Sequence, residues 1–207
     1  MDGQIIPLFS KAFYVKKLEI DTKKIISVMN KTFGSSGTKS TLDVKDISLV
    51  SESMSVLEED KFADLKSELM KEFYIFSNSI MFYPNEFGIT TSWFTKTTKN
   101  QSSNYHNHHN CMISGIFYLQ TDENSGDIVF EDFTNQRNKL IPKEYNIYNS
   151  TDYRIKPIDG LLILFPSEVH HKILKSTSDN SRYSLAFNLT PIGKIGAGDS
   201  YINMKLL

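Results

Sequence analysis

The side chains best suited to metal chemistry in this 207-residue sequence are its five histidines, which fall in two clusters. His106, His108 and His109 form the first cluster, and His170 and His171 form the second, far downstream. Imidazole nitrogens bind iron, zinc, copper and nickel, so the two clusters together predict a metal site without naming the metal. Taken alone, the first cluster could equally be surface residues in an asparagine-rich loop.

Alternation along a strand selects the histidines that can share one metal. A strand repeats its side-chain direction every two residues, so the two histidines of His106-Asn107-His108 project from the same face. In the second cluster, His171 shares a face with an isoleucine two residues on, whereas His170 shares a face with a lysine. Because isoleucine favours the interior and lysine favours solvent, we expect His171 to be the third ligand.

A basic residue follows the second cluster at the start of an apolar strand. Arg182 and Ser184 share a strand face, so a guanidinium and a hydroxyl point the same way. The guanidinium offers two donors in a fork and the hydroxyl offers a third, which is the chemistry that holds a carboxylate. The alternative is an ordinary surface arginine at the end of a strand.

Two helices in the first part of the chain must support this site. Asp21 is predicted to be the N-cap of a helix that ends at Gly34. Ser55 and Glu58 match a capping box. The apolar stripe that follows predicts a helix of about six turns packed against a sheet. Its members are Phe62, Leu65, Leu69, Phe73, Phe76 and Ile80.

Short strand signals separated by turn signals fill the chain after Pro84. Many short strands without intervening helices are typical of a β-sandwich or a jelly roll. We therefore predict a mainly β (α+β) fold. The predicted strands are Ile89–Thr95, Cys111–Leu119, Ile128–Glu131, Tyr153–Ile158, Leu161–Phe165, His171–Leu174 and Arg182–Leu189.

Composition excludes several other classes of protein. The chain has 23 Lys and Arg against 24 Asp and Glu, so no basic excess indicates an obligatory nucleic-acid or membrane partner. The single cysteine, Cys111, forms no internal disulfide and is expected to be a small buried residue rather than a metal ligand. The longest apolar run, Leu161–Phe165, is too short to span a bilayer, and no signal peptide is evident. We expect a cytoplasmic protein.

The ordered motifs together resemble the Fe(II)/2-oxoglutarate-dependent oxygenases, in particular a small bacterial and phage branch of that superfamily. No single motif is specific, but the set occurs in order and with matching spacings over most of the chain. The motifs are His106-Asn107-His108, Ser114-Gly115-Ile116-Phe117-Tyr118, Gly126-Asp127-Ile128-Val129-Phe130, Phe165-Pro166-Ser167 with His171, and Arg182-Tyr183-Ser184 with Asn188.

The resemblance implies a single domain over residues 1–207, with N-terminal strands and helices in 1–83 and a double-stranded β-helix core in 84–207. It implies that His106, His108 and His171 hold Fe(II). Arg182, with Ser184 and Tyr118, would bind the distal carboxylate of 2-oxoglutarate. With O2, such an enzyme hydroxylates its substrate and releases succinate and CO2. The substrate, a small molecule or a protein side chain, is not identified, and a homo-oligomer is compatible with the sequence.

One residue departs from the pattern of this superfamily, whose usual iron ligands are two histidines and one carboxylate. Here His108 stands at the carboxylate position, and Asp127 and Glu131 are the acidic residues on a following strand that could approach the metal. Two other functions remain open. One is a three-histidine zinc hydrolase or cupin-like metalloenzyme. The other is a non-catalytic jelly-roll module with a binding or structural role.

Overall fold

The computed structural model describes residues 3–7, 10–29, 47–132 and 141–206, and in these residues two antiparallel sheets dominate the protein. The large sheet has the order β1-β7-β4-β9-β3-β2, with β10 paired to β9, and the small sheet has the order β6-β5-β8. The strands are β1 (Tyr14–Lys17), β2 (Leu49–Val50), β3 (Glu86–Thr97), β4 (Ile113–Gln120), β5 (Ile128–Glu131), β6 (Asp152–Ile155), β7 (Leu161–Pro166), β8 (His170–Ile173), β9 (Arg182–Ile195) and β10 (Ile202–Met204).

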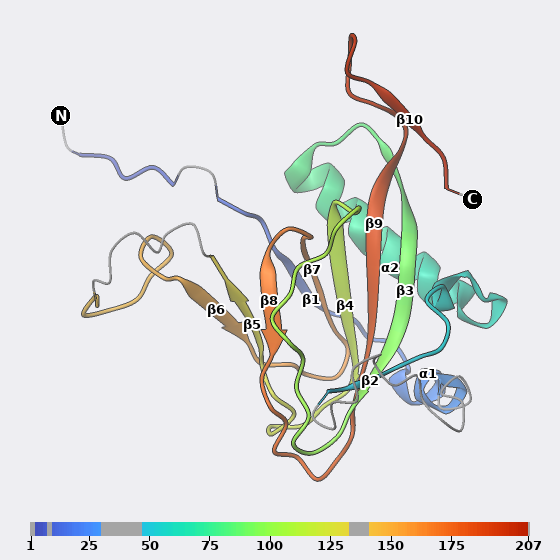
Figure 1. Cartoon of the computed structure of the whole chain (residues 1–207), viewed down its shortest axis with the longest axis vertical. Coiled ribbons are helices and arrows are strands. Elements are labelled where there is room, and N and C mark those ends of the chain that lie inside the picture. Colours follow the sequence, from blue (N-terminus) through green and yellow to red (C-terminus); the bar gives the residue numbers. More distant parts are fainter. Residues whose placement is uncertain (1–2, 8–9, 30–46, 133–140, 207) are drawn as a thin grey trace.

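The helices lie on one face of the large sheet, and the small sheet lies on the other side of the molecule (Figure 1). They are α1 (Thr22–Met29), the 3-10 turns η1 (Val56–Glu58) and η2 (Asp60–Phe62), α2 (Ala63–Phe76) and the π-helical turn η3 (Ser77–Met81). This arrangement confirms the mainly β fold with flanking helices and a jelly-roll, double-stranded β-helix core. The division of the chain at residue 83 stays a prediction.

Strand alternation distributes the apolar residues of the large sheet between two clusters. On β9, Leu185, Phe187 and Leu189 belong to the cluster that packs against the helices. On β7, Leu162 and Leu164 join this cluster, whereas Ile163 and Phe165 belong to a second cluster shared with the small sheet. The face of β9 that carries Arg182, Ser184 and Asn188 therefore points between the two sheets.

The predicted strands are confirmed, with shifted ends. The strand predicted over Tyr153–Ile158 ends at Ile155, shortly before Pro157, because a proline offers no amide donor with which the pairing could continue. The strand predicted to end at Leu189 continues to Ile195, because β3 and β10 pair with its second half. Asp21 caps α1 as predicted, since its carboxylate accepts a hydrogen bond from the amide of Lys24 at 3.2 Å. The predicted end of that helix at Gly34 lies outside the described residues.

The prediction of a six-turn helix with a capping box is wrong at both ends. Ser55 makes no side-chain cap, because η1 is instead anchored to β3 by a hydrogen bond from the amide of Leu57 to Ser92 Oγ at 2.9 Å. At the other end α2 widens into η3. This turn ends at Phe82, which has a left-handed backbone conformation and whose amide donates a hydrogen bond to the Ser77 carbonyl at 2.7 Å. Ile80 consequently leaves the buried stripe and is 55% exposed.

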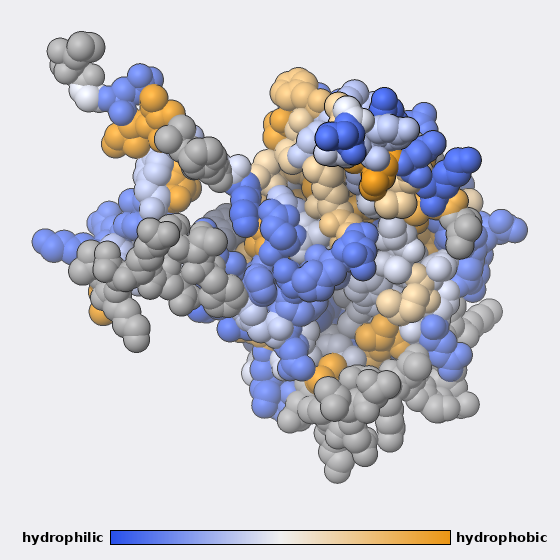
Figure 2. All heavy atoms as spheres, turned by 45° about the horizontal axis from the view of Figure 1, so that its top comes forward, coloured by the Kyte–Doolittle hydropathy of each residue, from blue (hydrophilic) through white to orange (hydrophobic). Residues whose placement is uncertain are grey.

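The chain before β1 runs out from the sheets as an extended arm (Figure 1). Its described apolar residues Ile5 and Ile6 are largely exposed, and the orange spheres on the projecting arm in Figure 2 show the same feature. The outer part of the arm therefore adds little to the core, whereas Phe13, just before β1, packs against the second cluster. Among the described residues, none of the helices combines the length and the apolar character needed to cross a bilayer.

We predict that Glu72 ties the edge strand β1 to α2. Its buried carboxylate accepts hydrogen bonds from the Tyr14 hydroxyl at 2.5 Å and from Lys16 Nζ at 2.7 Å. Burial raises the pKa of Glu72, but these two contacts outweigh it and hold that pKa below its usual value. Glu72→Ala should lower the free energy of unfolding by about 1–3 kcal/mol, measured by urea denaturation, because charge-assisted bonds are lost.

Glu68→Ala is the matched control for this prediction. Glu68 lies one turn earlier on α2 and pairs only with the exposed Lys71 at 3.0 Å. Its loss should change the free energy of unfolding by less than about 0.5 kcal/mol. Equal effects of the two substitutions would contradict the proposed tie.

Candidate metal and cosubstrate site

The first histidine cluster lies on the segment that joins β3 to β4. This segment is extended but is not a regular strand, which corrects the assumption behind the alternation argument. It is held beside β8 by paired backbone bonds between His106 and His171, with N–O distances of 3.0 and 2.8 Å. The amide of His108 bonds the Ser167 carbonyl at 2.9 Å. Backbone pairing to the small sheet thus brings both clusters together.

Three imidazoles converge on one point. His106, His108 and His171 each offer one ligand atom, and these atoms all lie within 4.8 Å of one another. His171 is buried, His108 is half-buried and His106 is exposed. The cluster therefore opens toward solvent at one histidine and is closed at another, an arrangement that leaves access to a bound ion.

Two of the three imidazoles also make a hydrogen bond to a backbone carbonyl. His106 Nδ1 lies 2.7 Å from the carbonyl of Asn104, and His171 Nδ1 lies 3.0 Å from the carbonyl of Val169. When one ring nitrogen donates to an oxygen, the other is left as a free lone pair, which is the form that binds metals.

The electrostatics of the cluster also favour neutral imidazoles. Burial, followed by the proximity of His106, lowers the pKa of His171 to about 3. The same two causes lower the pKa of His108 to about 4. Neutral rings near pH 7 need lose no proton to become ligands.

The two other histidines point elsewhere. On β8, His171 is buried, whereas His170 is partly exposed and stacks on the ring of Tyr105 at 5.8 Å. The alternation of β8 predicted this difference correctly. His109 is exposed.

Among the described residues, no carboxylate joins the three-histidine cluster. Glu131 lies opposite His170 in the pairing of β5 with β8 and bonds Lys172 at 3.4 Å, so it faces away from His171. Asp127 is also outside the cluster. Cys111 is half-buried rather than buried, which corrects that expectation, and its Sγ contacts the carbonyl of His109 at 3.4 Å.

Arg182 is a buried cation without an acidic partner among its hydrogen bonds. The side chain is 1% exposed, so Arg182 is not the ordinary surface arginine that the sequence left open as the alternative. Its Nη2 donates to Thr97 Oγ1 at 2.7 Å and its Nη1 donates to the Ser125 carbonyl at 3.3 Å, but Nε has no partner. Burial lowers its pKa from the usual value. A buried guanidinium in this state is costly unless an anion joins it.

The hydroxyl of Tyr118 is the second buried polar group here without a hydrogen-bond partner. Tyr118 lies opposite Ser184 in the pairing of β4 with β9, so both side chains share the face that carries Arg182. Burial raises the pKa of Tyr118 to about 12, so its hydroxyl stays a neutral donor. Two unmet donors on one buried face indicate a binding place for an anion.

One cavity of about 180 Å³ links the two groups of residues. The three clustered histidines, Arg182 and Ser184 all line it. Most of the other lining is apolar, as expected for a pocket in which a few polar groups fix the orientation of a ligand. The apolar lining includes Val50, Trp93, Ile116, Ile128, Phe165 and Ile173.

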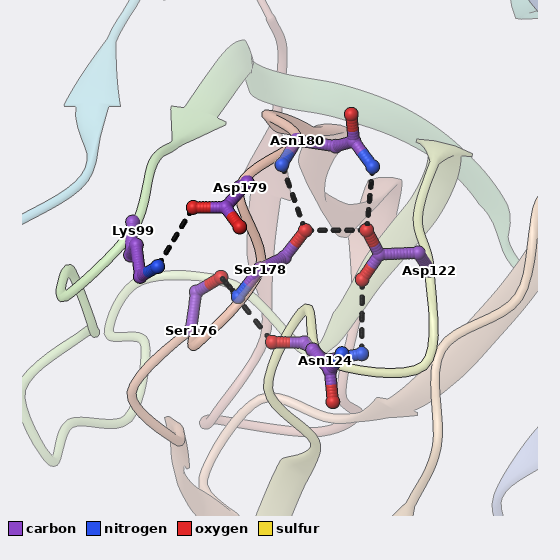
Figure 3. A network of polar contacts seen from close by, with 7 residues as sticks. All are labelled: Lys99, Asp122, Asn124, Ser176, Ser178, Asp179 and Asn180. Atoms are coloured by element: carbon purple, nitrogen blue, oxygen red, sulfur yellow. Dashed lines mark hydrogen bonds and ion pairs between the residues drawn. The ribbon is translucent and has the colours of Figure 1, made fainter.

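Two loops are joined by side-chain hydrogen bonds centred on Asp122 and Ser178 (Figure 3). Asp122, after β4, accepts hydrogen bonds from the Ser178 hydroxyl and from Asn180 Nδ2, the latter at 3.0 Å. Asp122 also bonds Ser125, whose carbonyl holds Arg182. Sequence reasoning treated these polar residues only as turn signals, because their pairing across the fold leaves no local pattern.

Comparisons with known proteins agree with this site. Residues 91–188 match the family described as "Putative 2OG-Fe(II) oxygenase", and this stretch contains the three clustered histidines and Arg182. Comparison with the curated proteins gives no match.

Solved structures share the fold of this chain at low sequence identity. A prolyl-4-hydroxylase from Pseudomonas putida is 14% identical with a TM-score of 0.59, covering 90% of this chain and 96% of that one. A Trichoplax adhaerens prolyl hydroxylase in complex with a hypoxia inducible factor peptide is 14% identical with a TM-score of 0.63, covering 86% and 83%. HygX from Streptomyces hygroscopicus, with nickel, 2-oxoglutarate and hygromycin B bound, is 12% identical with a TM-score of 0.60, covering 87% and 83%.

We predict an acid-sensitive contribution of Asp122 to stability. Hydrogen bonds from Ser178 and Asn180 lower its pKa from 3.8 to about 2. Because the folded-state pKa is the lower one, the contribution is full above the unfolded pKa and is lost as pH falls through the folded pKa. The difference in unfolding free energy between wild type and Asp122→Asn should be constant above about pH 5 and shrink between about pH 4 and 2.

This difference should not exceed about 1 kcal/mol, because Asp122 is partly exposed to solvent. Urea denaturation at several pH values measures it. Asp179→Asn, which removes only an exposed ion pair with Lys99 at 2.7 Å, is the control and should shift stability by less than about 0.5 kcal/mol. A difference that grows on acidification would rule out this account of Asp122.

Proposed function

We propose that this chain hydroxylates a substrate with Fe(II), 2-oxoglutarate and O2, because residues 91–188 match the family described as "Putative 2OG-Fe(II) oxygenase". One observation carries the proposal. Three imidazoles that can share a metal and a buried arginine without an acidic partner among its hydrogen bonds line the same cavity. The family match also favours an enzyme over a non-catalytic jelly-roll module.

We propose that His106, His108 and His171 hold the iron. Their ligand atoms lie close enough to share one ion, and burial keeps His108 and His171 neutral. The backbone carbonyls of Asn104 and Val169 contact Nδ1 of His106 and of His171, and so fix which nitrogen of each ring faces the ion. The residues present therefore fit a divalent metal of the imidazole-binding type.

We propose that Arg182 binds the distal carboxylate of 2-oxoglutarate, helped by Ser184 and Tyr118. The unpartnered Nε of Arg182 and the unpartnered hydroxyl of Tyr118 are the donors that such a carboxylate would satisfy. Ser184 lines the cavity on the same strand face as Arg182. Thr97 and the Ser125 carbonyl hold the guanidinium in place before the anion arrives.

With iron and 2-oxoglutarate bound, the cofactors supply an oxidation by O2 in which the substrate gains a hydroxyl and the cosubstrate leaves as succinate and CO2. The chain's own contribution is binding, orientation and the exclusion of water. Apolar side chains such as Trp93, Ile116 and Phe165 line the cavity and keep it dry.

The size of the cavity bears on the substrate. Pockets that enclose whole small ligands usually measure about 300–1,000 Å³, and this one measures about 180 Å³. The cosubstrate would occupy most of it, so we propose that the substrate stays at the surface and presents only its reacting group. A protein side chain fits this better than an enclosed small molecule. Among the structural neighbours, the Trichoplax adhaerens enzyme is bound to a peptide and HygX to hygromycin B.

The three-histidine ligand set favours a second candidate, a zinc hydrolase or cupin-like metalloenzyme. Zinc with three imidazoles and one open position activates water, and the described cluster contains no carboxylate. Arg182 would then bind substrate. Fe(II) and 2-oxoglutarate added without oxygen should give a visible charge-transfer band only if the oxygenase proposal is correct. Absence of the band, together with no rise in melting temperature on adding 2-oxoglutarate, would overturn that proposal.

We predict that the two adjacent histidines of β8 differ sharply in metal binding. His171→Ala removes a buried ligand and should weaken Co(II) binding at least about 100-fold, since loss of a supporting contact alone costs 10- to 100-fold. His170→Ala, the matched control, removes a ring that stacks on Tyr105 and should change Co(II) affinity less than about threefold. Titration of the Co(II) absorption measures both. Equal losses would refute the assignment of His171 as a ligand.

We predict that Arg182 acts on the cosubstrate and not on the metal. Arg182→Met should raise the dissociation constant for 2-oxoglutarate about 10- to 100-fold, because charge-assisted hydrogen bonds are lost. Co(II) affinity should stay within about threefold. Arg154→Met is the control, because Arg154 is exposed on β6 and pairs with Asp152 at 3.7 Å. An unchanged dissociation constant in Arg182→Met would remove Arg182 from the cosubstrate site.

A further inference from the structure

One support of the buried arginine continues into a part of the chain that the proposed function does not use. Thr97, the last residue of β3, accepts a hydrogen bond from Arg182 Nη2 at 2.7 Å. The Thr97 hydroxyl also contacts Ser48 Oγ, again at 2.7 Å. Ser48 directly precedes β2, and all three side chains are buried. Buried polar side chains carry a desolvation cost, so their alignment calls for a physical reason.

The register of neighbouring strands brings these three side chains into one row. β2 pairs with β3 so that Val50 lies opposite Thr95. Two residues further along each segment, the same register places Ser48 opposite Thr97. Thr97 in turn lies opposite Arg182 of β9, and opposed residues of antiparallel strands share a face. The row therefore crosses the large sheet at the lower end of β3 in Figure 1 and reaches the sheet edge at Ser48.

The hydrogen bonds of this row run in one direction. Ser48 Oγ donates to the Ser102 carbonyl at 3.4 Å, so its lone pairs remain to accept from Thr97. A hydroxyl carries one proton, and when Thr97 donates that proton to Ser48, its oxygen lone pairs are left for the guanidinium. Hydrogen bonds in such a chain polarise one another, so Ser48 strengthens the bond between Thr97 and Arg182.

The row is uncharged apart from the guanidinium at its end. A carboxylate in place of either hydroxyl would form an ion pair with Arg182 and would compete with an anionic ligand. The two hydroxyls instead hold Nη2 and leave Nε, which has no partner, for that ligand. Ser48 lines the same cavity as Arg182, so the support lies beside the place where the ligand would bind.

We propose that Ser48 is a positioning residue for Arg182 and that it acts through Thr97. Ser48 fixes the Thr97 hydroxyl as an acceptor, and Thr97 then holds the guanidinium in the orientation that leaves Nε for the distal carboxylate of 2-oxoglutarate. The segment before β2 thereby takes part in cosubstrate binding. This inference rests on the proposed function, because it takes Arg182 as the group that binds the cosubstrate.

Calorimetric titration of the Co(II)-loaded whole chain with 2-oxoglutarate tests the proposal. Thr97→Val removes the acceptor at similar volume and should raise the dissociation constant about 10-fold, because a hydrogen bond to a charged group is lost. Ser48→Ala should raise it about three- to tenfold, since the Thr97 hydroxyl then lacks its acceptor. Thr97→Ser keeps the hydroxyl and should stay within about twofold of wild type. Co(II) affinity should stay within about threefold in every variant.

Ser51→Ala is the matched control on the same segment. Ser51 is also buried, and its hydroxyl accepts a hydrogen bond from the Phe94 amide at 3.0 Å and donates one to the Ser53 carbonyl at 2.8 Å. Its loss should lower the melting temperature but change the dissociation constant for 2-oxoglutarate less than about twofold, because these bonds lead to backbone groups and not to Thr97. A merely structural role of the segment would make the two alanine variants alike.

A double-substitution cycle shows whether Ser48 acts through Thr97. In the Thr97→Val background, Ser48→Ala should change the dissociation constant less than about twofold, since the hydroxyl through which it acts is gone. A serine that contacts the cosubstrate directly would weaken binding equally in both backgrounds, and that result would overturn the positioning role.

The outcomes separate this inference from the proposal beneath it. If wild type binds no 2-oxoglutarate, or if Arg182→Met binds it as tightly as wild type, the proposed cosubstrate site is wrong and the role of Ser48 is wrong with it. If Arg182→Met loses affinity while Ser48→Ala binds as tightly as wild type, only the role of Ser48 is wrong.

Discussion

The alternation of β9 is the constraint on which the rest of this structure depends. The strand pairs along its length with β3 and with β4. Any change in its register, or in which side chains point to which face, would therefore break the hydrogen bonds to both neighbours. One face packs against the helices through Leu185, Phe187 and Leu189. The other face must then carry its polar residues into the space between the sheets. The same packing that stabilises the large sheet thereby directs Arg182 into the cavity in which its role is proposed.

Burial of Arg182 favours the binding of an anion but lowers the stability of the protein without that anion. A guanidinium held only by Thr97 and one carbonyl is under-satisfied, and a protein selected for stability alone would place an apolar residue there. The loops around it are correspondingly well braced, since Asp122 joins the loop that carries Ser125 to the loop that leads into β9. An anionic ligand that completes the hydrogen bonds of Arg182 offsets the cost of burying the guanidinium, and this gain contributes to the free energy of binding.

Local periodicity predicted those features of the fold that depend on one strand at a time. The alternation of side chains along a strand predicted which face of the strand carries His171 and which carries Arg182. Apolar runs between turn signals predicted the strands themselves. The errors concern tertiary contacts. At Ser55 the predicted capping box does not form, and the Leu57 amide instead donates a hydrogen bond to Ser92. His106 and His108 are held by backbone hydrogen bonds to His171 of β8 and to Ser167, and not by a regular strand. The clasp at Asp122 and the hydrogen bonds of Asn188 with Ser114 and Thr91 join residues far apart in the sequence, where no periodic pattern exists to reveal them.

The three-histidine set changes the charge of the site as well as its geometry. Three neutral imidazoles leave both charges of a divalent ion uncompensated, whereas two imidazoles and a carboxylate leave one. Arg182 adds a further positive charge to the same cavity. A dianionic cosubstrate that spans metal and arginine is therefore better matched electrostatically than a neutral ligand. The described residues supply neutral oxygen acceptors to two of the imidazoles, namely the backbone carbonyls beside His106 and His171. Neutral acceptors fix these rings without cancelling the positive charge that attracts the cosubstrate, so the three-histidine ligand set and its backbone supports act in the same direction.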